Sequence, residues 1–209
     1  MGQRNSLTGL VLAGGASTRF GSDKAHALFA GETLFARVCT ALAAACDEVI
    51  AVAGPGRELP PVPIPLRTVA DDHPGAGPLA GLITGMKAAA GRSVFAAACD
   101  LPLLDATTIT AIASALESTA AAAAVPRIEG RLQPLAAAYS IAACRGPFEA
   151  AFTAGERSLQ GALRSITLVE LEVHGPMALA LRQANTPAEL RTLADAIRDI
   201  SGSGLAGRG

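Results

Sequence analysis

The sequence has 209 residues but no tryptophan, one tyrosine and only two lysines. Aromatic residues make up 3% of the chain, so its core must be built mainly from alanine, leucine, valine and isoleucine. The formal net charge is −1 and no basic run is present, which argues against a general nucleic-acid-binding or membrane-surface protein. No apolar stretch approaches the roughly 18 residues that a membrane-spanning helix requires, so no membrane partner is expected.

Familiar cysteine, histidine and serine motifs are also missing. The cysteines are Cys39, Cys46, Cys99 and Cys144. Their spacing fits neither a metal site nor a disulfide framework, so we interpret them as buried free thiols in a cytoplasmic protein. The histidines are His26, His73 and His174. They lack ligand spacing and are interpreted as surface or loop residues. The first residues are polar and an apolar run then meets glycines, so no signal peptide is expected.

Apolar runs and helical patterns alternate through the first 120 residues. A buried parallel strand is expected at 7–13, and further strands are expected at 48–54, 66–71 and 93–100. Helices are expected at 33–45, 78–91 and 105–118, and the proline-rich segment 55–65 is expected to be a loop. This alternation predicts an α/β domain with a mostly parallel central sheet.

The second half is less regular. We expect strands at 120–126, 132–140 and 167–173, with the first two paired, and a final amphipathic helix at 186–200. Residues 1–200 are interpreted as one domain, and 201–209 as a disordered tail. The order of the strands in the sheet does not follow from these patterns.

The loop after the first strand is the strongest functional candidate. Gly14 and Gly15 lack Cβ atoms, so the backbone there can approach a ligand and its N–H groups can bind an anion. Arg19 and Lys24 supply a planar donor fork and a point charge, which suit a polyphosphate. Taken alone, a glycine pair after a strand is more often a plain turn, and the loop has neither G-x-x-x-x-G-K-[ST] nor G-x-G-x-x-G.

Two aspartates follow strands, where open α/β sheets bind their ligands. Asp100 ends the run "VFAAACD" and offers Mg²⁺ a carboxylate, although a turn or capping role is the simpler alternative. Asp71 ends "LRTVAD", with a surface turn as its alternative. Further on, "GAGPLAG" leads into a helix N-terminus that could bind an anion, or serves only helix packing. Asn185 precedes the last helix, near Thr186 as its N-cap.

The stretch "LAGGASTRFGSDKA" resembles the nucleotide-binding signature of the molybdenum cofactor guanylyltransferases, LAGGxSxRMGxDKA. The matching positions are Leu12, Ala13, Gly14, Gly15, Ser17, Arg19, Gly21, Asp23, Lys24 and Ala25. Phe20 stands where methionine is usual. The resemblance continues in order through Asp71, "GAGPLAG", "ACDLP", "RLQPLAAAYS" and "ANTPAEL", and so covers nearly the whole chain from residue 10 to about residue 190.

The resemblance implies a three-layer Rossmann-like nucleotidyltransferase fold, with helices on both faces of the sheet. The implied activity is transfer of GMP from GTP to molybdopterin with release of pyrophosphate, assisted by Mg²⁺ on Asp100. Arg19, Lys24 and Asp100 are the implied catalytic residues, and Asn185 would face the metal or the acceptor. The implied nucleotide-binding residues are Leu12, Ala13, Gly14, Gly15, Arg19, Lys24, Asp71, Gly77, Pro78, Leu79 and Asp100. Transient contacts with other molybdenum cofactor biosynthesis proteins are also implied.

Two details leave alternatives open. The related cytidylyltransferases read LAAG, so Gly14 favours guanine, with a CTP-dependent enzyme or another phosphorylated acceptor as the alternative. Many relatives carry an asparagine after the second strand, whereas residues 51–54 read "AVAG". Two other classes of protein are less consistent with the sequence. A non-catalytic nucleotide-binding module would not need Lys24, Asp71 and Asp100 together, and an NAD-dependent oxidoreductase would show G-x-G-x-x-G. Arg131 and Gln133 are candidates for the acceptor half.

Overall fold

A computed structural model describes residues 6–14 and 23–203 of the chain, and its centre is an eight-stranded sheet with the order β10-β7-β9-β6-β1-β4-β5, in which β8 pairs with β7. The strands of this sheet are β1 (Leu7–Leu12), β4 (Glu48–Ala53), β5 (Arg67–Ala70), β6 (Ser93–Ala98), β7 (Ala123–Ile128), β8 (Arg131–Leu132), β9 (Ala136–Ser140) and β10 (Leu168–Glu172). Two further short strands, β2 (Leu28–Phe29) and β3 (Glu32–Thr33), form a separate hairpin.

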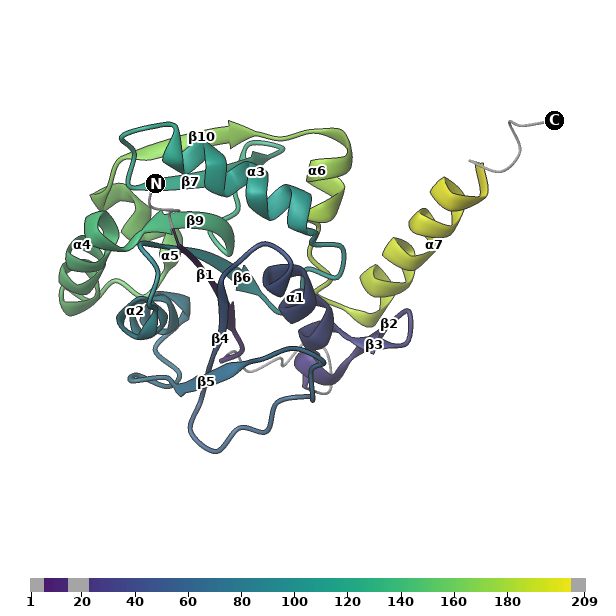
Figure 1. Ribbon diagram of the computed structural model, residues 1–209, viewed down its shortest axis with the longest axis horizontal. Coiled ribbons are helices and arrows are strands. Elements are labelled where there is room, and N and C mark those ends of the chain that lie inside the picture. Colours follow the sequence, from purple (N-terminus) through teal and green to yellow (C-terminus); the bar gives the residue numbers. More distant parts are fainter. Residues whose placement is uncertain (1–5, 15–22, 204–209) are drawn as a thin grey trace.

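Helices cover both faces of this sheet (Figure 1). The helical elements are η1 (Lys24–His26), α1 (Leu34–Ala43), α2 (Pro78–Ala88), α3 (Ala106–Glu117), α4 (Ile141–Thr153), α5 (Leu159–Ala162), η2 (Leu163–Ser165), α6 (Gly175–Ala180) and α7 (Pro187–Ser203). One apolar core unites α1 and α3 with one face, and a second unites α2, α4 and α5 with the other. The predicted arrangement of a sheet between two helical layers is confirmed.

The central strand β1 shows why the sheet is buried on both sides. Val11 belongs to the core beneath α1 and α3, its neighbour Leu10 belongs to the core beneath α2, and both side chains are fully buried. Successive side chains of a strand point to opposite faces, so a continuous apolar run suits a strand covered on both sides. The polar Thr8 is buried as well, and its hydroxyl donates to Glu48 Oε1 at 2.7 Å.

Most neighbouring strands are parallel, as the alternation of the sequence predicts. β1 pairs in parallel with β4 and β6, β4 with β5, and β7 with β10. The exception in the main path is β9, which runs antiparallel to both β6 and β7. We call the side on which β1, β4, β5, β6 and β7 end the carboxyl edge of the sheet, because that is where ligands bind in folds of this kind.

Two expected boundaries are wrong. The helix expected at 78–91 ends at Ala88, because Ala89 is extended and Gly91 packs so closely that a Cβ there would lie 2.5 Å from the Ser6 carbonyl oxygen. Pro126 lies inside β7 and does not end it, since β7 pairs with β9 only through Ala123 and Ala124 and the missing N–H is not needed there.

A further difference is helix α4, which the sequence patterns did not predict. It continues through Pro147, a residue that normally breaks helices, and it buries Cys144 and Phe148 in the core beneath α2. Tertiary packing of this apolar stripe therefore outweighs the local preference against a helix.

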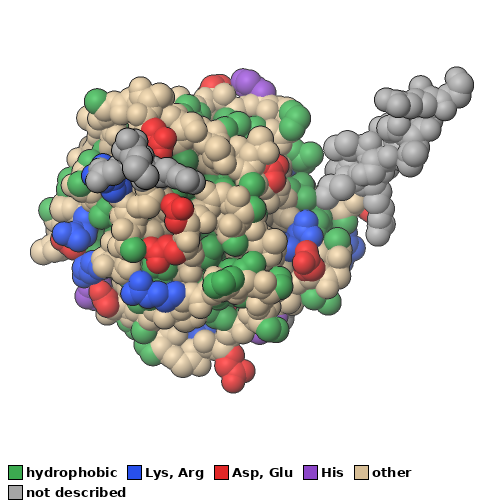
Figure 2. All heavy atoms as spheres, in the orientation of Figure 1, with side chains coloured by type: hydrophobic (Ala, Val, Ile, Leu, Met, Phe, Trp, Pro, Cys, Tyr) green, Lys and Arg blue, Asp and Glu red, His purple; other side chains and the backbone are tan. Residues whose placement is uncertain are grey.

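The last helix, α7, extends away from the body of the molecule (Figure 1). Its first turns pack through Leu190 and Leu193 against Phe29 of the β2–β3 hairpin and Leu34 of α1. Over the face shown in Figure 2, acidic and basic side chains are interspersed. Within the described ranges, none of the helices combines the length and apolar character of a membrane span.

Candidate active site

Three polar side chains from distant parts of the chain meet at the carboxyl edge. The Lys24 ammonium donates to Asp100 Oδ2 at 2.6 Å and to Asn185 Oδ1 at 3.0 Å. The side chains of Lys24 and Asp100 are only 11% and 13% exposed. Because an ion pair so shielded from water is costly to bury, its place at the ligand-binding edge points to a functional role for both residues.

Each partner is held by its own local structure. Lys24 begins the short helix η1, whose N-cap is the Asp23 carboxylate. Asp100 follows β6 by two residues, and its carbonyl oxygen accepts the Ala184 N–H at 2.9 Å, which brings the neighbouring Asn185 to the site. Helix α7 is then capped by Thr186, whose hydroxyl accepts the N–H of Glu189 at 3.1 Å.

Asp100 retains one unused oxygen. Its Oδ1 is buried and accepts no hydrogen bond within the described part of the chain. A buried carboxylate oxygen without a donor is unfavourable unless a cation or a ligand completes it. No group of three or more metal-ligating side chains occurs among residues 6–14 and 23–203. A single carboxylate such as that of Asp100 is nevertheless a common protein contribution to a Mg²⁺ site beside phosphates.

Asp71 lies where β1, β5 and α2 converge. Its Oδ1 accepts the backbone N–H of His73 at 3.0 Å and the Thr84 hydroxyl at 3.4 Å. Its Oδ2 lies 3.9 Å from the place of a Cβ on Gly14 and 4.0 Å from that of a Cβ on Gly81. The fixed carboxylate thus lies beside the exposed Gly14, and beside Gly81, which is buried against the Leu12 side chain. Thr84 carries no signal of this contact in the sequence, because it looks like an ordinary core residue in the apolar pattern of its helix.

The N-terminus of α2 depends on Gly77. This residue has φ of +92°, and a Cβ on it would lie 2.8 Å from the Arg157 carbonyl oxygen, so only glycine fits. Gly77 gives the helix no side-chain cap, and Pro78 occupies the first turn. The Leu79 side chain is fully buried in the core, so any contact of Leu79 with a nucleotide must use its backbone.

Two residues of the predicted phosphate loop, Gly15 and Arg19, lie outside the described residues. Leu12, Ala13 and Gly14 are described, and the Ala13 N–H donates to the Val52 carbonyl at 2.9 Å, which extends the β1–β4 pairing to the loop. The structure thus brings Lys24, Asp100 and Asn185 into direct contact, and places Asp71 beside Gly14 at the same edge.

Arg57 also reaches this region, although its proline-rich segment was interpreted only as a loop. Its guanidinium lies 2.5 Å from Asp23 Oδ1. Burial raises the pKa of Asp23, but the Ala25 N–H and the Arg57 guanidinium outweigh it, so the pKa falls below the usual value. Nothing in the spacing of the sequence signals this contact, because 34 residues separate its partners.

The cysteines are free thiols, as interpreted from their spacing. Burial and the neighbouring Asp100 raise the pKa of Cys99 to about 11, while Lys24 and Arg57 act in the opposite direction. Burial likewise raises the pKa of the other three thiols to about 12. They are therefore protonated at neutral pH, which suits a packing role better than a nucleophilic one.

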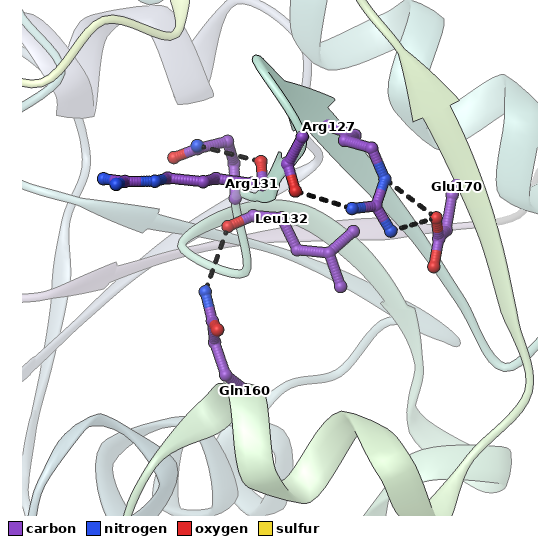
Figure 3. Close-up of polar contacts among 7 residues, drawn as sticks. Arg127, Arg131, Leu132, Gln160 and Glu170 are labelled. Atoms are coloured by element: carbon purple, nitrogen blue, oxygen red, sulfur yellow. Dashed lines mark hydrogen bonds and ion pairs between the residues drawn. The ribbon is translucent and has the colours of Figure 1, made fainter.

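A braced hairpin rises from the carboxyl edge where β7 turns into β8 (Figure 3). Arg127 forms an ion pair with Glu170 and donates to the Gly130 carbonyl at 2.7 Å. Two glutamines hold the next carbonyls: that of Arg131 accepts from Gln133 at 3.2 Å, and that of Leu132 accepts from Gln160 at 3.4 Å.

Arg131 is the residue that this bracing presents to solvent. Its side chain points away from Arg127 and Glu170 in Figure 3 and makes no hydrogen bond or ion pair within the described ranges. At the start of β9 the Leu135 carbonyl accepts the Ala98 N–H at 3.1 Å, two residues before Asp100. The hairpin therefore rises over the same edge of the sheet as the Lys24–Asp100 pair.

Solved structures with a similar fold include a molybdopterin-guanine dinucleotide biosynthesis protein and a cytidylyltransferase. Molybdopterin-guanine dinucleotide biosynthesis protein A from Archaeoglobus fulgidus superposes with a TM-score of 0.76 at 20% identity, covering 92% of this chain and 99% of its own. The 2-C-methyl-D-erythritol 4-phosphate cytidylyltransferase from Thermus thermophilus superposes with a TM-score of 0.68 at 18% identity, covering 90% of this chain and 98% of its own. The fold is thus the Rossmann-like nucleotidyltransferase fold expected from the sequence.

The sequence comparisons narrow this class to one family. Residues 9–170 match the model of the MobA-like NTP transferase domain. A probable molybdenum cofactor guanylyltransferase from Chloroflexus aggregans is 33% identical over 195 residues, which are 88% of this chain and 92% of the relative. Another protein of that name, from Mycobacterium avium, is 32% identical over 201 residues, which are 94% of this chain and 99% of the relative. The protein belongs to the MobA-like NTP transferase family and is an enzyme of the nucleotidyltransferase class.

Proposed function

We propose that this protein is a molybdenum cofactor guanylyltransferase, which transfers GMP from GTP to molybdopterin in the synthesis of molybdopterin guanine dinucleotide. The observation that carries the proposal is the shielded contact of Lys24 with Asp100 and Asn185 at the carboxyl edge. The resemblance of the loop to the family signature and the names of the relatives support the choice of substrates. Localisation in the cytoplasm, and transient contacts with other proteins of the same biosynthesis, belong to this proposal.

The reaction joins two anions. A phosphate oxygen of molybdopterin attacks the α-phosphorus of GTP, the bond from that phosphorus to the α,β-bridging oxygen breaks, and pyrophosphate leaves with the electron pair. The attacking phosphate is already ionised, so no strong general base is needed. Catalysis then rests on holding the reactants in line and balancing the developing negative charge, for which Lys24 and Arg19 are the proposed cations.

The nucleotide would lie against Gly14 and Gly15, which have no Cβ atoms to block its approach to the backbone at the carboxyl edge. Leu12, Ala13 and Gly14, with Gly15, are proposed to offer backbone groups to the nucleotide, and Asp71 to contact it beside them. The N–H groups of the first turn of α2, after Gly77, point toward the same edge as donors. Gly77 and Leu79 would act through their backbone N–H groups, whereas Pro78, which has no N–H, would contact the nucleotide through its ring.

Asp100 fits the role of Mg²⁺ ligand. The buried Oδ1 without a donor is an oxygen that a cation would complete, and phosphates of the substrate would supply further ligands. A bound Mg²⁺ would supply Lewis-acid charge at the α-phosphate. Asn185 offers an amide oxygen on the metal or acceptor side, while Lys24 keeps the Asp100 carboxylate oriented.

Incubation with Mg²⁺, molybdopterin and each of GTP, CTP, ATP and UTP tests the proposal. Pyrophosphate release should be fastest with GTP, and molybdopterin guanine dinucleotide should be the product. A preference for CTP would instead support the cytidylyltransferase alternative. Release with GTP only when another phosphorylated acceptor is supplied would overturn the choice of molybdopterin. No release with any acceptor or nucleotide would favour a nucleotide-binding module without catalysis.

Molybdopterin is expected to bind at the braced hairpin, because Arg131 offers it a guanidinium that has no protein partner within the described residues and lies at the carboxyl edge. Arg131→Ala should raise KM for molybdopterin by roughly tenfold, as expected when a charge-assisted hydrogen bond is lost, and leave KM for GTP unchanged. Steady-state kinetics with each substrate varied in turn measure both constants.

A matched control is Arg145→Ala, which removes an exposed arginine of α4 at the opposite edge of the sheet. It should alter neither constant. If Arg131→Ala raised KM for GTP as strongly as KM for molybdopterin, the hairpin would belong to the nucleotide half, and its assignment to the acceptor would be wrong.

A further inference from the structure

Arg57 connects the segment after β4 to the turn that carries Lys24. A tight turn closes where the Arg57 N–H donates to the Gly54 carbonyl at 3.2 Å, with Gly56 at φ of +72°. From this turn the guanidinium reaches Asp23 Oδ1 at 2.5 Å. Residues 51–54, at the end of β4 and just after it, read "AVAG" and have no polar side chain. Arg57, three residues later, brings a polar side chain to this part of the carboxyl edge.

The atom that Arg57 contacts already has a structural task. Asp23 Oδ1 accepts the Ala25 N–H at 3.1 Å and thereby caps η1, while Asp23 Oδ2 lies 3.6 Å from His26 Nδ1. A helix of three residues has little stability of its own, so its geometry depends on this cap. Because Lys24 is the first residue of η1, a shift of Asp23 would move the ammonium away from Asp100 and Asn185.

The contact between Arg57 and Asp23 also affects the electrostatics of the site. Asp23 is ionised at neutral pH and is 34% exposed next to the residue proposed to bind phosphates. A bare carboxylate there would repel a triphosphate across a site partly shielded from water. The Arg57 guanidinium, 21% exposed, neutralises that charge from the side of β4. Asp23 can therefore cap the turn without weakening anion binding.

We propose that Arg57 is a positioning residue for nucleotide binding, which acts through Asp23 by fixing the Lys24 turn and cancelling the carboxylate charge beside the triphosphate. This role rests on the proposed function only in that the site binds a nucleoside triphosphate. It differs from the roles of Lys24 and Asp100, because Arg57 acts through another side chain and not on the reacting phosphates.

Equilibrium titration with Mg²⁺-GTP tests this role without any need for the acceptor. Arg57→Ala should raise Kd for GTP about tenfold, since a charge-assisted contact is lost and a carboxylate is left facing the phosphates. Arg57→Lys keeps the positive charge but not the planar guanidinium, so its Kd for GTP should lie between those of the wild type and Arg57→Ala. Asn caps helices as well as Asp does, so adding Asp23→Asn to Arg57→Ala should return Kd to within about threefold of wild type.

The matched control is Arg67→Ala, because Arg67 lies on the neighbouring strand β5 and donates to the Ala88 carbonyl, away from Asp23. Its Kd for GTP should not change. If Arg57→Ala fails to fold, as judged from its thermal unfolding, Arg57→Gln provides the uncharged variant with a donor retained.

The outcomes distinguish failure of the positioning role from failure of the proposed function. An unchanged Kd in the uncharged Arg57 variant would overturn the positioning role while leaving the proposed function intact. A raised Kd that Asp23→Asn does not restore would show that Arg57 acts by another route, and would also overturn it. Wild-type protein that binds no nucleoside triphosphate would overturn the proposed function and the role of Arg57 with it.

Discussion

Lys24→Ala is expected to lower the turnover of GTP by a factor of roughly 10² or more, the loss found when a single charge-stabilising donor is removed from a transition state. The ammonium would no longer balance the charge on the leaving pyrophosphate. Asp100 would also lose the cation that now lies 2.6 Å from its Oδ2. Single-turnover measurement with saturating GTP and molybdopterin separates this effect from weaker binding.

The second lysine provides an unusually clean control, because the chain has only two. Lys87 pairs with Asp72 at 3.2 Å on the exposed side of α2, so Lys87→Ala should retain normal turnover. Removing Lys24 also leaves a shielded carboxylate without its partner, which should lower the unfolding temperature. The assay must therefore be run well below the transition of the variant. Turnover within a few-fold of wild type under those conditions would show that Lys24 does not act on the phosphates.

Asp100→Asn is expected to have an effect of similar size, also about 10²-fold on turnover, because it removes the carboxylate proposed to hold Mg²⁺ while preserving the side-chain volume. The amide still offers Lys24 an oxygen, but the shielded ammonium loses its counter-charge, so the unfolding temperature should fall and the assay must again be run well below the transition of the variant. The Mg²⁺ concentration that gives half-maximal activity should rise. Calorimetric titration of Mg²⁺ into the protein with GTP gives a second readout, in which weaker coupling of metal and nucleotide is expected.

Asp105→Asn is the matched control for this change. Asp105 caps α3 through the Thr108 N–H at 2.7 Å, and asparagine serves as well at an N-cap. Its turnover and Mg²⁺ requirement should stay normal. If Asp100→Asn kept the wild-type dependence on Mg²⁺, the buried Oδ1 would need another explanation, and the metal would have to be held elsewhere.

Local patterns predicted most of the elements, because apolar runs of strand length and helical periodicity both reflect burial in this fold. They failed where packing decides. Helix α4 forms despite Gly146 and Pro147, since Cys144 and Phe148 have a core to enter. The strand order could not be predicted either, because the position of β6 between β1 and β9 depends on pairings distant in the sequence.

The site shows the same division between motif and tertiary structure. Motifs singled out Lys24 and Asp100, which are 76 positions apart and form the central ion pair. They also singled out Asn185, yet only the Ala184–Asp100 backbone hydrogen bond explains its arrival at Lys24. Arg57 had no signal, because a lone arginine in a proline-rich segment has no periodicity or motif to distinguish it. Ligand-binding roles for all of these residues stay predictions until the variants are measured.

The reversed strand β9 has a consequence for how such an enzyme can diversify. Because β7 and β9 run in opposite directions, the chain between them returns over the carboxyl edge as a hairpin, whereas the glycines and aspartates of the other half follow parallel strands. Insertions or exchanges at 129–133 can therefore reshape the hairpin at the carboxyl edge without moving β1, β6 or the Lys24–Asp100 pair. Selection for a new acceptor could act on this hairpin while the nucleotide chemistry is inherited unchanged.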